Sequence, residues 1–111
     1  MVKPALFHPA ATAAIRAFPD EVRRELGKAI YDLQCGESLG MPVSKPMPSI
    51  APGVSELRIR DRSGIYRAFY FAMSAKGIIV FHAFAKKTQA APNKEIAAGR
   101  KRLLEMLHEK K

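Results

Sequence analysis

Four basic residues in the second half of the chain have the types and spacing to bind a phosphate. Arg58 ends the stretch GVSELR, Arg67 ends GIYR, and Lys86 and Lys87 close the apolar stretch VFHAFAKK. A planar guanidinium offers two parallel donors to phosphate oxygens, and an ammonium adds a compact positive charge. These residues are candidates for holding a phosphate, provided that the fold brings them together.

The segments that carry the arginines predict a β-hairpin. Residues 54–60 and 65–73 are rich in residues of high β propensity and flank the turn-like tetrapeptide DRSG. If that tetrapeptide is the loop, Arg58 lies directly opposite Arg67 on the neighbouring strand. Side chains that lie directly opposite each other point to the same face of a sheet.

An arginine pair of this kind needs an explanation, because like charges directly opposite each other destabilise a sheet. Glu56 or another partner can offset the charge, a phosphate can bind between the guanidinium groups, or the side chains can splay into water. The sequence leaves these explanations open.

The register of the next hairpin decides which lysine joins the arginines. A two-residue turn at Lys76-Gly77 would place Arg67 opposite Lys86. It would also bring His82 to the same face. One more residue in the turn would bring Lys87 there instead, and the sequence does not settle this register. With either register, a lysine ends the third strand near the two arginines, and the three form a cationic cluster.

The overall charge agrees with an anionic partner. The 111 residues carry a net charge of +9, with six Lys/Arg against five Asp/Glu in residues 1–50 and thirteen against five in residues 51–111. The net charge is therefore +1 in the first part and +8 in the second. This asymmetry favours RNA, DNA or an acidic protein as the partner, and a basic surface kept for solubility is the alternative.

The remaining elements must support the cluster, and their patterns predict one α+β domain over residues 1–111. Its fold is an N-terminal helical hairpin packed on a small twisted antiparallel sheet, followed by a C-terminal helix. In chain order we expect a strand in 2–7, a helix over 9–18, a helix from an Asp20 N-cap to about Gly36, a loop over 40–53 with at most one edge strand, the hairpin, a buried strand over 77–84 and a helix capped by Asn93.

Other chemistry has little support in the sequence. A single cysteine, Cys35, permits no internal disulfide and fits a reducing cytosol. The longest apolar run, 77–85, is far shorter than the roughly 20 residues that span a bilayer. His8 and His108 lack metal-ligand spacing, and we expect neither a metal nor another cofactor. His82, within an apolar strand, is more typical of a hydrogen-bonded core histidine than of a catalytic base.

The ordered set of motifs resembles the RelE/ParE superfamily of toxins, and within it the HigB-like, phage-derived branch. The stretches GVSELR, GIYR and VFHAFAKK carry the resemblance, and FPDEVRREL near the N-terminus extends it over nearly the whole chain. The fold that this resemblance implies agrees with the one predicted from the residues. Ribonucleolytic members of the superfamily are metal-independent endoribonucleases that usually cut messenger RNA in the ribosomal A site.

The resemblance implies roles for individual residues. Arg58, Arg67 and Lys87 would be catalytic: Arg67 would stabilise the transition-state phosphate, Arg58 would bind phosphate, and Lys87 would stabilise charge or protonate the leaving group. Further RNA contacts are expected from Arg60, Arg62, Lys86 and His82. The resemblance also implies an antitoxin partner with a helix-turn-helix domain, in a toxin–antitoxin hetero-oligomer.

The general base is the point at which the sequence departs from the family pattern. Some ribonucleolytic relatives place a tyrosine or histidines near the C-terminus, whereas residues 88–94 here are followed by a predicted helix. Either His82 or a basic side chain with a shifted pKa would then serve as the base, or the activity would be weak. Two alternatives therefore remain: a ParE-like toxin that binds DNA gyrase without ribonuclease activity, and a basic nucleic-acid-binding module.

Overall fold

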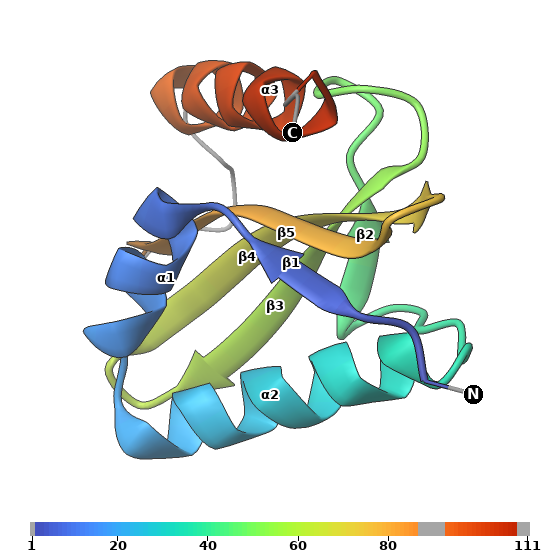
Figure 1. Cartoon of the computed structure of the whole chain (residues 1–111). Coiled ribbons are helices and arrows are strands. Elements are labelled where there is room, and N and C mark those ends of the chain that lie inside the picture. The colour runs from blue at the N-terminus through green and yellow to red at the C-terminus, as the bar shows by residue number, and fades with distance from the viewer. Residues whose placement is uncertain (1, 87–92, 109–111) are drawn as a thin grey trace.

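The computed structural model describes residues 2–86 and 93–108 of the chain. A five-stranded sheet lies between helices α1 and α2 on one face and helix α3 on the other (Figure 1). The elements are β1 (Ala5–Phe7), α1 (Pro9–Arg16), α2 (Asp20–Gln34), β2 (Ser44–Pro46), β3 (Val54–Asp61), β4 (Gly64–Ser74), β5 (Gly77–Lys86) and α3 (Asn93–Leu107). The predicted α+β architecture is confirmed.

The sheet has the strand order β1-β5-β4-β3-β2. Its last four strands are antiparallel neighbours, as predicted, but β1 pairs with β5 in parallel. The sheet is therefore mixed, not wholly antiparallel. A parallel pair needs a long crossover connection, and here α1, α2 and the rest of the sheet lie between β1 and β5 in the chain.

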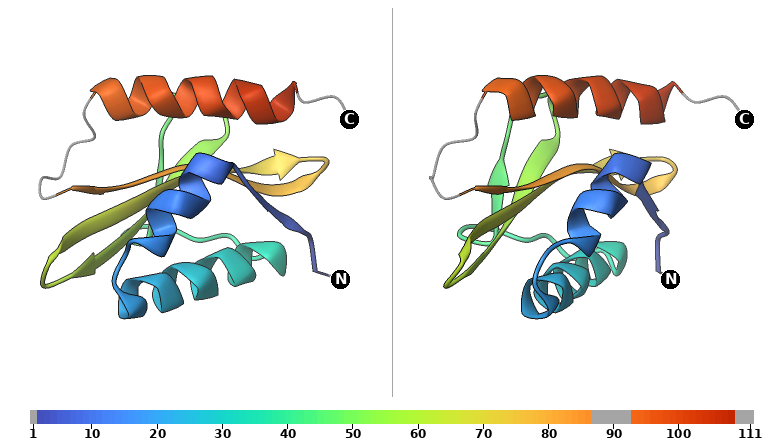
Figure 2. Two further views of the ribbon diagram at one scale, coloured as in Figure 1. Left: turned by 60° about the vertical axis from the view of Figure 1, so that its left-hand side comes forward. Right: turned by 90° about the vertical axis from the view of Figure 1, so that its left-hand side faces the viewer.

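Two apolar clusters hold the helices to the sheet. On one face, the stripe of α2 residues that includes Val22, Leu26 and Leu33 packs against residues of β3 and β4 such as Leu57 and Tyr66. This stripe was predicted from the helical spacing of its members. The other face is only partly covered, because the β3–β4 hairpin slopes away from α3 (Figure 2).

The α3 contact depends on a glycine. A Cβ atom on Gly99 would lie 2.8 Å from Cδ2 of Phe69, so only glycine lets the helix approach the sheet this closely. Leu103, 3% exposed, fills the next turn of the same contact. The described part of the chain has no helix long and apolar enough to span a membrane.

Two predicted N-caps are wrong in detail, because Asp20 and Asn93 are each the first residue of their helix. Asp20 is the first residue of α2, and Pro19 occupies the N-cap position. Asp20 and Glu21 instead place negative charge in the first turn, where it interacts favourably with the helix dipole.

Candidate nucleic-acid interface

The β3–β4 hairpin has the predicted register. Arg58 pairs with Arg67, and Arg60 pairs with Ile65. The loop closes at Asp61 and Gly64, which is possible because Gly64 adopts a positive φ of 151°. The two arginines therefore occupy the same face of the sheet, on the side that α3 only partly covers.

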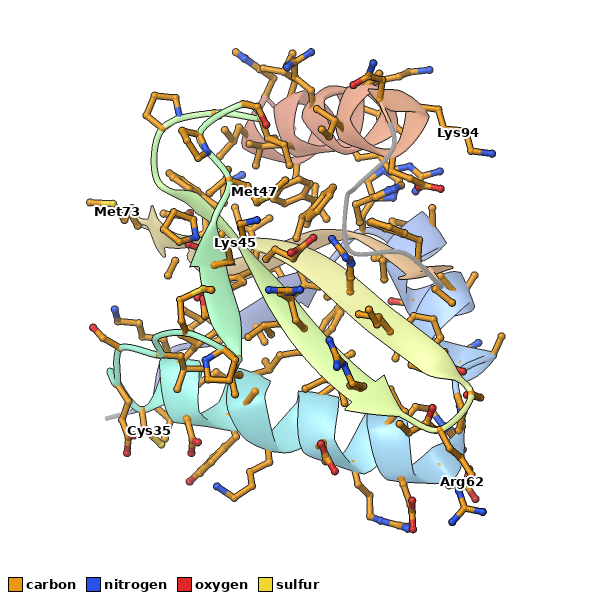
Figure 3. The ribbon with its side chains drawn as sticks, turned by 180° about the vertical axis from the view of Figure 1, so that it is seen from behind. Cys35, Lys45, Met47, Arg62, Met73 and Lys94 are labelled. Atoms are coloured by element: carbon orange, nitrogen blue, oxygen red, sulfur yellow. The ribbon has the colours of Figure 1, made fainter. Side chains whose placement is uncertain are left out.

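A lysine from the edge strand joins this face. Lys45 of β2 pairs with Glu56, two residues before Arg58 on β3. We call the residues Lys45, Arg58, Arg60 and Arg67 the basic face; it is seen in Figure 3, with α3 above and α2 below it. Four positive charges and the one negative charge of Glu56 give this area a net charge of +3. A face with this charge suits an anionic ligand.

Glu56 lies between the two paired arginines. Its Oε2 is 3.0 Å from Nη1 of Arg67, and its Oε1 is 3.6 Å from Nε of Arg58. The side chain of Glu56 is fully buried and that of Arg67 is 2% exposed. The carboxylate offsets the repulsion between the arginines, which is the first of the three explanations considered from the sequence. The arginine pair is thus accounted for structurally without a bound phosphate.

The basic face becomes more accessible from Arg67 toward Arg60. Arg67 is buried, the side chain of Arg58 is 15% exposed, and Arg60 is exposed. A cavity of about 360 Å³ lies beside Arg58 and Arg60 and is also lined by Pro42, Val43 and Ile65. An anion that approaches this cavity reaches Arg60 and Arg58 directly.

The hairpin of β4 and β5 has a different register from the one expected for either lysine. Ser74 pairs with Gly77, so the turn is Ala75-Lys76, one residue earlier than the turn considered from the sequence. The two irregularities further along the strands cancel, and Arg67 lies opposite Phe84. Arg67 therefore lies opposite neither lysine, and both of the registers considered from the sequence are wrong. Lys86 pairs with Ile65, two residue pairs further along. Lys87, the predicted third catalytic residue, lies outside the described residues.

Arg62 occupies the tip of the β3–β4 hairpin. It is exposed and points away from the sheet (Figure 3). A contact with RNA from this position would extend beyond the basic face.

His82 is buried under α3 and hydrogen-bonded on both ring nitrogens. Its Nε2 is 2.7 Å from Oε1 of Glu95, and its Nδ1 is 2.7 Å from Nη1 of Arg102. An arginine can only donate, so Nδ1 accepts and Nε2–H donates to the carboxylate. Burial lowers the pKa of His82, with the hydrogen bond to Glu95 acting in the opposite direction. The ring therefore joins β5 to α3 as a neutral imidazole, which is the core role that the sequence favoured.

Two residues of this region were not predicted from the sequence: Lys45 of the basic face, and Arg102, which contacts His82. Lys45 sits in a three-residue strand within a proline-rich segment, where no periodic pattern assigns it to a face. Arg102 was not among the candidate residues, yet its guanidinium reaches from α3 to His82. Neither position has a signal in the sequence that could have revealed it, because each depends on how an element packs.

A second histidine also joins α3 to the rest of the fold. His8 caps α1 by accepting the backbone N–H of Ala10 at Nδ1, and its Nε2 is 2.7 Å from Oε1 of Glu105. This hydrogen bond lowers the pKa of Glu105. No group of three or more His, Cys, Asp or Glu side chains that could hold a metal ion occurs among residues 2–86 and 93–108.

Comparisons with known proteins agree with this fold. The model of the phage-derived Gp49-like family (DUF891) matches residues 13–104. This chain belongs to the Gp49-like family. The resemblance to the phage-derived branch of the RelE-type toxins, carried by the sequence motifs, is thereby confirmed.

A solved structure shares the fold. It is that of the Escherichia coli toxin RelE in the free state, in a variant with two arginines replaced by alanine. The similarity has a TM-score of 0.54 at 19% sequence identity and covers 94% of this chain and 99% of the RelE chain. A search of curated proteins finds no match.

Proposed function

We propose that this Gp49-like chain is the toxin of a type II toxin–antitoxin pair and that it inhibits translation by cutting messenger RNA on the ribosome. The observation that carries this proposal is the basic face itself. It places the exposed Arg60 and the partly exposed Arg58 beside the buried Arg67, on the part of a RelE-like sheet that α3 does not cover. The proposed target places the protein in the cytoplasm.

The chemistry needs no metal or cofactor. The ribose 2′-hydroxyl loses its proton to solvent water and attacks the adjacent phosphorus, which forms a 2′,3′-cyclic phosphate. The bond to the 5′-oxygen breaks, that oxygen takes up a proton, and negative charge grows on the phosphoryl oxygens during the reaction. Preorganised donors that face this charge each contribute a factor of about 10²–10³ in rate. In the proposed reaction Arg58 binds the phosphate, Arg67 stabilises the transition state, and Lys87 stabilises charge or protonates the leaving 5′-oxygen.

Glu56 has a positioning role in this proposal. Its two carboxylate oxygens face Arg67 and Arg58, so it fixes both guanidinium groups before a substrate arrives. Groups that are already oriented need no reorganisation when the charge develops. His82 contributes indirectly, because it attaches α3 beside the basic face.

An antitoxin with a helix-turn-helix domain is the proposed partner. An acidic segment of such a protein would complement the basic face and compete with RNA for the same arginines.

Induced expression in bacteria tests the proposal. Because Arg67 is buried against Glu56, Arg67→Lys is a better variant than Arg67→Ala: it keeps the charge beside the carboxylate and removes the planar fork. We expect the wild type to arrest growth and to create new in-frame 5′ ends in messages within minutes. Arg67→Lys and Arg58→Ala should lower cutting by about 10²-fold or more.

Arg24→Ala is the matched control, since Arg24 is exposed on α2, away from the basic face. Thermal unfolding of each purified variant shows whether the fold is kept. Growth arrest with intact RNA would instead indicate a protein target such as DNA gyrase. Absence of arrest would indicate a plain nucleic-acid-binding module.

A further inference from the structure

The cavity beside Arg58 and Arg60 has an apolar wall that the proposed chemistry does not use. Pro42, Val43 and Ile65 form this wall. Pro42 and Val43 precede β2 on one side of β3, and Ile65 lies on the other side, paired with Arg60. The volume of about 360 Å³ is at the lower end of the range for ligand pockets, about 300–1,000 Å³. The cavity therefore suits one small unit with an anionic part and an apolar part.

The wall is fixed to the sheet. The carbonyl oxygen of Val43 accepts the backbone N–H of Arg58 at 2.8 Å. The next residue, Ser44, pairs with Leu57, and its hydroxyl lies 2.6 Å from that of Tyr70. The wall and the arginines consequently keep a constant separation, as a preformed site requires.

We propose that this cavity is a subsite for one nucleotide of single-stranded RNA. The phosphate of this nucleotide lies on Arg60 and shares Arg58 with the reacting phosphate, and the base packs against Pro42, Val43 and Ile65. The proposal deepens the proposed function, because it takes RNA as the substrate class. It assigns to the wall a contact with the nucleotide next to the one whose phosphate faces Arg67.

Three features favour a nucleotide in this cavity. Arg58 belongs both to the cavity and to the pair with Arg67, so an occupant of the cavity is continuous with the proposed reaction site. Arginine forks bind phosphate oxygens bidentately. The wall supplies apolar surface for a base without base-specific donors, so binding should depend on the presence of a base more than on its identity.

Calorimetry with two probes of equal charge tests the subsite. The first probe is a 2′-O-methylated tetra-adenylate, which cannot be cut because its 2′-oxygens are blocked. The second has the same backbone and no bases. At low ionic strength we expect the full-length chain to bind the base-bearing probe about tenfold more tightly, since a base buries apolar surface on the wall.

Val43→Ala isolates the wall. Val43 is 37% exposed, so the change should leave the fold intact. It should reduce the preference for the base-bearing probe about fivefold, the effect of losing roughly one kcal/mol of apolar contact. Arg60→Ala should weaken both probes alike. The matched control is Met73→Ala, at an exposed position near the far end of β4, which should change neither affinity.

Several outcomes would overturn the subsite. Two of them are equal affinity for the two probes and an unchanged preference for the base-bearing probe in Val43→Ala. The third is a tetra-glutamate peptide that binds as tightly as tetra-adenylate, which would assign the cavity to an acidic peptide. Message cutting by the wild type together with any of these results would reject the subsite and keep the ribonuclease. Base-dependent binding without cutting or growth arrest would reject the ribonuclease and keep the subsite.

Discussion

Replacement of Glu56 by glutamine should destabilise the fold severely for so small a change. The substitution preserves size and shape but removes the negative charge between Arg58 and Arg67. Both charged groups of the Glu56–Arg67 pair are at least 98% buried, with Nη1 and Oε2 separated by 3.0 Å. Breaking a buried pair by removing one partner costs about 3–5 kcal/mol, because the remaining charge stays buried.

The second arginine adds to this cost. Arg58 and Arg67 lie directly opposite each other, so their repulsion is no longer offset once the carboxylate is gone. We therefore expect the free energy of unfolding to fall by about 3–5 kcal/mol, a large part of the total for a domain of this size. Urea denaturation, with extrapolation to zero denaturant, measures the difference.

Two further variants make the measurement decisive. Glu37→Gln removes the same charge from an exposed loop and should change stability by less than about 0.5 kcal/mol. The double variant Glu56→Met with Arg67→Met should be more stable than the sum of its single changes predicts, by about 1 kcal/mol or more, because it removes both buried charges together. A loss below about 1 kcal/mol in Glu56→Gln would refute the view that Glu56 offsets the arginine pair.

Two other predictions concern the packing of the helices. Gly27→Ala should stabilise the fold by about 0.5–1 kcal/mol, because α2 leaves open space there. Gly99→Ala should destabilise the fold by about 1–3 kcal/mol, because the new Cβ would meet Phe69. Thermal unfolding of the two variants measures the difference, and equal effects on stability would contradict the close approach of α3. Burial lowers the pKa of His82, so below pH about 6.5 the unfolded chain binds more protons than the folded one, and stability falls as the pH falls. When the free energy of unfolding is measured between pH 7 and 5, its dependence on pH should be weaker in His82→Gln but not in His108→Gln. An unchanged dependence in His82→Gln would show that another group causes it.

The sequence by itself determined the fold class and most of the elements. The stripe on α2, the change to strand patterning after residue 53 and the DRSG turn are local features, so they could be recognised without knowledge of the packing. The turn also fixed the register of its two strands, because side chains alternate with a period of two. The pairing of Arg58 with Arg67 followed from that register alone.

Contacts between distant segments could be decided only by the tertiary structure. The β4–β5 turn falls at Ala75-Lys76, so Arg67 lies opposite Phe84 and not opposite Lys86. The short strand β2 brought Lys45 beside Glu56. The parallel pairing of β1 with β5 likewise depends on where the chain returns after α1 and α2.

The meaning of the arginine pair was also decided by the tertiary structure. The sequence could name Glu56 as one of several explanations, but not choose it, because the choice depends on burial and on the position of a carboxylate relative to two guanidinium groups. In the folded chain Glu56 is fully buried between them. A local pattern predicts which residues share a face, whereas the energy of a charged group depends on its complete three-dimensional surroundings.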